Sequence, residues 1–209
     1  MEKISLYDLL SILLPGSLLT LFIEMMSKDL NFGFENIELS YYFSLTVFLS
    51  SAIFLGSIIN ILTRKLLKFY KRIGLYKPLH KIYKQIHKDS EIISYYDSLM
   101  DKYPKKYSFE EKIIHIWDKI YYKLEANEKI AVPKTFQSFY FFFRNFFTLS
   151  LILLIPVIFM IIYKWFTLKY TIILIVIFVS APLNIFAGNW NRTKMVVRMF
   201  WTYYSLYKK

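Results

Sequence analysis

The segment Leu39–Thr63, LSYYFSLTVFLSSAIFLGSIINILT, contains no charged residue and is the clearest indication of the fold class of this chain. A helix that crosses the hydrocarbon core of a bilayer needs about 20 mainly apolar residues, which this stretch supplies. Three more stretches are long and mainly apolar, namely Ile4–Met26, Asn145–Tyr163 and Tyr170–Asn191. Because helices buried in soluble proteins seldom show this pattern four times, the sequence predicts an all-α, polytopic membrane protein with four transmembrane helices.

The composition agrees with this prediction only if apolar and basic residues are segregated along the chain. Hydrophobic residues make up 56% of the sequence, yet 27 Lys and Arg face 15 Asp and Glu, for a net charge of +12. Of these cations, 23 lie between Arg64 and Arg144 or after Asn191. The absence of cysteine excludes a disulfide scaffold. The cations therefore mark water-exposed segments next to a membrane.

The distribution of cations also predicts the domain organisation and the topology. Residues 1–63 and 145–191 form two transmembrane hairpins, separated by a basic helical insert at 64–144 and followed by a basic amphipathic tail at 192–209. The positive-inside rule places the insert and the tail in the cytoplasm. An even number of spans then places the N-terminus there as well.

The insert between spans two and three is expected to fold into three or four short amphipathic helices. Ser108 and Glu111 have the spacing of a capping box, directly ahead of an apolar stripe at helical period. Next to the membrane stands a basic cluster with two open interpretations, contact with anionic lipid headgroups or contact with RNA. Its members are Arg64, Lys65, Lys68, Lys71 and Arg72.

The sequence offers no catalytic, cofactor-binding or metal-binding constellation. Its glycines form neither a phosphate-binding loop nor a dinucleotide fingerprint. His80, His87 and His115 lack the spacing of a zinc site, and there is no cysteine to complete one. None of the three has an arginine five positions earlier, as the Arg-x4-His motif of HEPN ribonucleases requires. We therefore expect a protein that is not an enzyme.

Polar and small residues form stripes on three of the predicted spans, and two interpretations remain open. Such stripes pack helices together through close approach and interhelical hydrogen bonds, or they line a water-filled passage in an assembly of several copies. Glu24 is the leading pore candidate, because a carboxylate near a pore mouth favours cations. The stripes comprise Ser17, Thr20, Glu24, Thr46, Ser50, Gly56, Ser57, Asn60, Ser180, Asn184, Gly188 and Asn191.

The opening Tyr7-Asp8-Leu9-Leu10, followed by Leu14-Pro15-Gly16, resembles the start of small multi-span proteins found beside bacterial defence systems. With four spans and a basic insert, the chain resembles the larger membrane accessory protein of type VI-B CRISPR loci. The resemblance implies a bacterial inner-membrane protein that modulates an RNA-guided RNA-cleaving nuclease.

Two functions compete at this point, and a small transporter ranks behind both. The leading hypothesis is a homo-oligomeric pore or membrane-perturbing effector, whose insert responds to the nuclease or to its RNA products. The alternative is a non-conducting anchor that recruits or restrains the nuclease through the insert. The lipid bilayer is the partner common to both.

Overall fold

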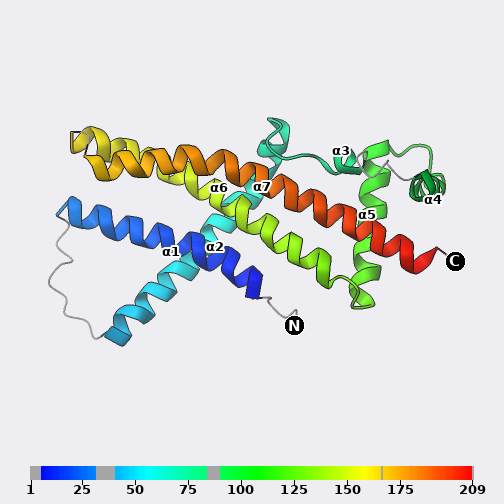
Figure 1. Ribbon diagram of the computed structural model, residues 1–209, viewed down its shortest axis with the longest axis horizontal. Helices are drawn as coiled ribbons and strands as arrows, with labels where there is room; N and C mark the ends of the chain where they lie inside the picture. Colours follow the sequence, from blue (N-terminus) through cyan, green and yellow to red (C-terminus); the bar gives the residue numbers. More distant parts are fainter. Residues whose placement is uncertain (1–5, 32–40, 84–89, 166, 209) are drawn as a thin grey trace. The chain divides into compact units, whose positions relative to one another are not determined.

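The computed structural model describes residues 6–31, 41–83, 90–165 and 167–208 (Figure 1), and this part of the chain folds into α-helices without any β-strand. The helices are α1 (Leu6–Asp29), α2 (Tyr41–Arg72), α3 (Leu79–Tyr83), α4 (Ser90–Met100), α5 (Phe109–Ala126), α6 (Ala131–Tyr163) and α7 (Leu168–Tyr207). The predicted span ends 4–5 and 39–40, and His87, lie outside the described residues.

Four of the helices, α1, α2, α6 and α7, are long and apolar enough to cross a membrane. This confirms the predicted all-α class with four candidate membrane helices. All four continue past the predicted apolar stretches, α1 by only three residues, to Asp29, and the other three much further. Helix α2 runs on to Arg72, α6 begins at Ala131 rather than near Asn145, and α7 runs past Asn191 to Tyr207.

The chain divides into two compact units, each built from separate parts of the sequence. Residues 1–69 and 141–188 make up the first, called here the apolar unit. Residues 70–140 and 189–209 make up the second, called the helical subdomain. Most of the predicted insert and the predicted tail thus belong to one unit, in which the tail forms the last part of α7 rather than a separate element.

In the apolar unit, α1, α6 and α7 share a small buried cluster. Phe22 of α1 packs with Val157 and Met160 of α6 and with Tyr170 and Ile177 of α7. Figure 1 shows α6 and α7 side by side over this stretch, as expected for consecutive helices joined by a short connection. The shared cluster holds the last two candidate spans against the first.

The helical subdomain has the larger core, built mainly by α3, α4, α5 and the end of α7. Apolar residues of α3, α4 and α5 pack there with residues from the end of α7. The buried members are Ile82, Tyr83, Ile92, Tyr96, Met100, Ile113, Ile116, Ile120, Leu124, Ile130, Met195, Val196, Met199, Phe200 and Tyr203.

A tyrosine and a phenylalanine fix α4 to α7 at the centre of this core. The Tyr96 hydroxyl donates a hydrogen bond to the backbone oxygen of Phe200 at 2.6 Å. The two rings meet edge to face with their centroids 4.7 Å apart, an arrangement that aromatic pairs prefer. Because Tyr96 is fully buried, this bond satisfies a hydroxyl that has lost its contact with water.

Helix α5 begins with the capping box that the sequence predicts. The backbone N–H of Glu111 donates to the Ser108 hydroxyl at 3.3 Å, and the Ser108 N–H donates to the Glu111 carboxylate at 2.7 Å. Two of the unpaired N–H groups at the helix start are satisfied in this way. The cap sets the register in which α5 presents Ile113, Ile116 and Ile120 to the core.

Candidate functional site

Helices α1 and α2 cross at two glycines, so closely that no side chain fits at either position. A Cβ atom on Gly16 would lie 1.7 Å from the backbone oxygen of Ala52, and one on Gly56 would lie 2.0 Å from that of Ile12. Close approach of backbones through small residues is a common way for membrane helices to associate. Gly56, a residue of the predicted stripes, therefore lies in a helix contact. Gly16 is not among the predicted stripe residues, although Gly16-x3-Thr20 has the spacing of small residues at a helix contact.

Several hydroxyls of the predicted stripes donate hydrogen bonds within their own helices. Thr20, Thr46, Ser57 and Ser180 donate to the carbonyls of Gly16, Tyr42, Ile53 and Ile177 at distances of 2.8–3.3 Å. Such back-bonding satisfies a hydroxyl inside an apolar medium without a partner helix or water. These four groups are therefore compatible with lipid, with a helix contact or with a lumen.

The remaining stripe positions differ in burial. Ser50 is exposed, Ser17 and Asn184 are half-buried, and Gly188 and Asn191 are buried on α7. Within the described residues, Ser17, Ser50 and Asn184 make no side-chain hydrogen bond.

A buried polar layer joins α1, α2 and α6, and it includes one residue of the predicted stripes. The guanidinium of Arg144 donates to the Asn60 amide oxygen at 3.2 Å, and Arg144 is only 3% exposed. The Asn145 amide donates to the backbone oxygen of Ser11 at 3.0 Å. Buried polar pairs in membrane bundles fix which helices meet and in which register. Arg144 and Asn145 stand at the predicted boundary of span three, where no sequence pattern indicates a helix contact.

Glu24 lies exposed on α1 and forms an ion pair with Lys28, one turn later, at 2.8 Å. A pair of this kind is worth about 0.3–0.5 kcal/mol in water, so it restrains neither side chain strongly. A stronger tie lies close by in sequence, where Asp29 accepts hydrogen bonds from Lys169 and from the Tyr170 hydroxyl, each at 2.6 Å. That tie joins the end of α1 to the start of α7.

The predicted basic cluster lies on the last turns of α2. All five side chains are exposed: Arg64, Lys65, Lys68, Lys71 and Arg72. Four of them, all but Lys71, make no ion pair within the part of the chain that the structure describes. Their charges are thus open to an anionic surface, and both interpretations of the cluster stand.

Two side chains of α7 hold the segment that follows α2 in the helical subdomain. The Asn189 amide accepts from the Lys77 backbone N–H at 2.9 Å and donates to the Leu75 backbone oxygen at 2.7 Å. Arg192 donates to the backbone oxygen of Lys77 and lies 5.7 Å from the centre of the Tyr140 ring. These bonds satisfy backbone groups that no helix pairs, and they lock residues 75–77 onto α7.

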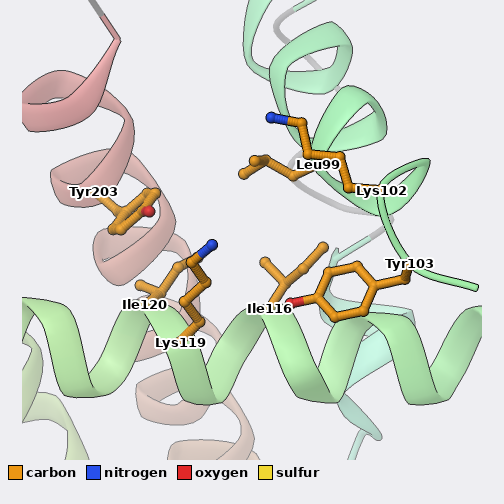
Figure 2. Close-up of a pocket in the computed structure, with 7 residues that line it drawn as sticks. All are labelled: Leu99, Lys102, Tyr103, Ile116, Lys119, Ile120 and Tyr203. Carbon is orange, nitrogen blue, oxygen red and sulfur yellow. The ribbon is translucent and has the colours of Figure 1, made fainter.

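A small pocket lies in the helical subdomain where α5, α7 and the turn after α4 meet (Figure 2). Its volume is about 110 Å³. Leu99, Ile116 and Ile120 supply its apolar walls. Its polar groups belong to Lys102, Tyr103, Lys119 and Tyr203. In Figure 2, Ile116, Lys119 and Ile120 rise from α5 toward α4 and α7.

Among the described residues, no three His, Asp or Glu side chains come together. His80 instead lies 3.2 Å from Glu110, and His115 stacks on the ring of Tyr103 with centroids 5.9 Å apart. Both histidines thus have structural neighbours within the helical subdomain.

No protein-family model, curated protein or solved structure matches this chain.

Proposed function

We propose that this protein is a membrane-anchored regulator, in which apolar helices hold a helical subdomain at the membrane surface. The observation that carries the proposal is the continuity of α7. One 40-residue helix supplies the fourth candidate span and then the centre of the subdomain core, with Met199, Phe200 and Tyr203. A subdomain built around the end of a membrane helix cannot leave the bilayer, which suits the recruitment or restraint of a partner at that surface.

The proposed partner is an RNA-guided RNA-cleaving nuclease of a bacterial defence system. The resemblance to the accessory membrane protein of type VI-B CRISPR loci supports this choice, through Tyr7-Asp8-Leu9-Leu10 and Leu14-Pro15-Gly16. The concentration of cations in the insert and tail supports a cytoplasmic subdomain at the bacterial inner membrane, where such a nuclease can reach it.

A homo-oligomeric pore is the second candidate, and it has its own supporting observation. Thr46 and Ser50 of α2 and Glu24 of α1 are exposed on the single chain. In an assembly of several copies, these groups could face a common lumen. The anchor ranks first because the Thr46 hydroxyl is satisfied within its own helix and Glu24 pairs with Lys28.

The two functions separate in cells that carry the nuclease and its guide together with the full-length protein. One variant, Phe200→Ala, removes a ring at the centre of the subdomain core, at a cost of about 3–5 kcal/mol. The other combines Thr46→Val with Ser50→Ala and leaves the subdomain intact. Target RNA is then supplied, and RNA cleavage and membrane potential are recorded together.

The anchor predicts that Phe200→Ala abolishes the effect on RNA cleavage, while the α2 double variant retains it and the membrane potential stays constant. Depolarisation that begins on target recognition and changes in the α2 variant would establish the pore instead. RNA cleavage that responds equally to the wild type and to Phe200→Ala would contradict regulation through the subdomain.

A further inference from the structure

Helix α2 has a buried face and an exposed face, and the exposed face changes character where the uncharged segment ends. Ala52, Ile59 and Thr63 are fully buried on one side of the helix. At about 3.6 residues per turn, the opposite side carries residues spaced alternately by four and three positions. This exposed set, called here the outer stripe, comprises Phe54, Ile58, Ile61, Lys65 and Lys68. The outer stripe is thus apolar up to Ile61 and basic from Lys65 onward.

The uncharged segment determines the depth at which the two lysines lie when α2 crosses a bilayer. Residues 39–63 supply the roughly 20 apolar residues that cross the hydrocarbon core. Lys65 and Lys68 follow Thr63 after about 3 and 8 Å of helix, at about 1.5 Å per residue. The headgroup layer is about 5–8 Å thick on each side of the hydrocarbon core. Both lysines are therefore expected at the depth of the lipid headgroups.

The direction of α2 turns these lysines back toward the bilayer. In an α-helix, every Cα–Cβ bond tilts toward the N-terminus of the helix. Because Lys65 and Lys68 follow the apolar part of α2, their N-terminal side is the membrane side. A lysine stem lies readily along apolar surface while its ammonium group stays in a polar layer. The outer stripe thus directs two ammonium groups toward lipid phosphates rather than away from the membrane.

The charge around the outer stripe indicates which headgroup fits. The sequence has no Asp or Glu between Leu39 and Lys88. Arg64, Lys65 and Lys68 are exposed and make no ion pair in the part of the chain that the structure describes. A zwitterionic headgroup carries its own cation, which repels these side chains, whereas an anionic headgroup leaves a negative charge for them to neutralise. The charge therefore favours an anionic lipid.

We propose that Lys65 and Lys68 bind the headgroup of an anionic phospholipid on the outer face of α2. Their ammonium groups donate hydrogen bonds to its phosphate oxygens, while Ile58 and Ile61 contact its acyl chains. Arg64 adds a third cation one turn before Lys68, on a neighbouring position of the helix surface. RNA fits less well, because side chains that lean back toward the bilayer are turned away from a ligand in water. The inference rests on the proposed anchoring in a membrane, but not on the nuclease partner.

The test uses the full-length protein in nanodiscs that contain equal amounts of phosphatidylglycerol and phosphatidylcholine. Native mass spectrometry of the released protein counts the lipids of each kind that remain bound. The wild type should retain phosphatidylglycerol over phosphatidylcholine by about fivefold or more, the preference that one cation near an anionic surface provides. The double variant Lys65→Gln/Lys68→Gln should lower this preference by about fivefold or more, because it removes two such cations.

Two control variants separate a site on α2 from the net charge of the protein. Lys65→Arg/Lys68→Arg keeps both cations and should keep the preference. Lys119→Gln/Lys129→Gln removes the same charge at two exposed lysines of the helical subdomain, and its preference should equal that of the wild type. Equal retention of both lipids by the wild type would overturn the proposal. So would an unchanged preference in Lys65→Gln/Lys68→Gln, or an equal loss in both glutamine variants.

A further arm tests RNA as the occupant of the same cations. Labelled single-stranded RNA is added to the protein in nanodiscs of phosphatidylcholine alone. RNA that binds the wild type but not Lys65→Gln/Lys68→Gln, together with equal retention of the two lipids, would assign these cations to RNA and overturn the lipid site. Equal lipid retention by a protein that enters nanodiscs leaves the membrane anchor standing. Failure to enter nanodiscs of either lipid would refute the anchor and the lipid site together.

Discussion

Gly16 sets the distance between α1 and α2, because its missing side chain leaves room for the backbone of Ala52. In Gly16→Ala, the new methyl carbon would lie only 1.7 Å from the backbone oxygen of Ala52. The two helices must then move apart, and overpacking of this kind costs about 1–3 kcal/mol. We expect a fall of that size in the free energy of unfolding, measured by denaturant titration in detergent. Ser57→Ala is the control, and equal stability of Gly16→Ala would contradict this helix contact.

The ion pair between Glu91 and Lys208, 2.7 Å long, makes the stability of the subdomain depend on pH. Lys208 lowers the pKa of the Glu91 carboxyl by donating a hydrogen bond, and the same bond raises the pKa of Lys208. The carboxylate therefore stabilises the fold above its unfolded-state pKa of about 4.3, and this contribution is lost as pH falls through the lower folded-state pKa. The ammonium contributes below about pH 10.4 and is lost as pH rises through its raised folded-state pKa.

Glu91→Gln should accordingly lower the thermal midpoint between about pH 5 and 10, and the difference from the wild type should shrink below about pH 4. Asp118→Asn replaces an exposed carboxylate that has no ion pair in the described chain. Its difference in thermal midpoint from the wild type should not shrink at acidic pH. If the thermal midpoints of the wild type and Glu91→Gln differed by the same amount at every acidic pH, the ion pair with Lys208 would not be the cause of the difference.

Patterns within one segment of the sequence predict the positions of the helices, but contacts between distant segments leave no such pattern. Absence of charge predicted the apolar parts of α1, α2, α6 and α7, and the Ser108 cap lies where its spacing predicted. Helix α6 begins 14 residues before Asn145, with Pro133 in its first turn, where proline is tolerated. That start was missed because residues 131–144 mix aromatic, polar and charged side chains, so no uncharged stretch marks them.

The residues that join distant segments could not be predicted in the same way. Asn189 pairs with backbone groups 112 and 114 positions away, and the pocket brings Tyr203 beside Lys102 and Lys119. In the sequence, Asn189, Lys102 and Lys119 have no feature that separates them from ordinary solvated polar residues. Their distinguishing neighbours lie about a hundred positions away along the chain. On α2, the predicted stripe contains Gly56 and Asn60, but no sequence pattern indicates their partners Ile12 and Arg144.

For the whole molecule, the chief consequence is that the helical subdomain is not a removable insert. Deletion of residues 192–209 takes away Met195, Val196, Met199, Phe200 and Tyr203, all buried in its core. Truncating one such side chain costs about 2–5 kcal/mol, and a domain is stable by only about 5–15 kcal/mol. We therefore expect the deletion to unfold residues 70–140. Limited proteolysis in detergent should cleave within them, whereas Trp201→Ala, at an exposed side chain of the same helix, should remain resistant.

Because α7 contributes to that core, the core can be completed only when the last part of the chain has been synthesised. The ribosome makes residues 70–140 first, then 48 residues of the apolar unit, and only then the residues from Asn189 that complete the core. At about 5–20 residues per second, this delay lasts roughly 2–10 s. Throughout it, the apolar faces of α3, α4 and α5 have no α7 to cover them. Synthesis of the last two candidate spans must therefore be complete before the core of the subdomain can form. A nascent chain that stalls before Asn189 leaves the apolar faces of these helices exposed to chaperones and proteases.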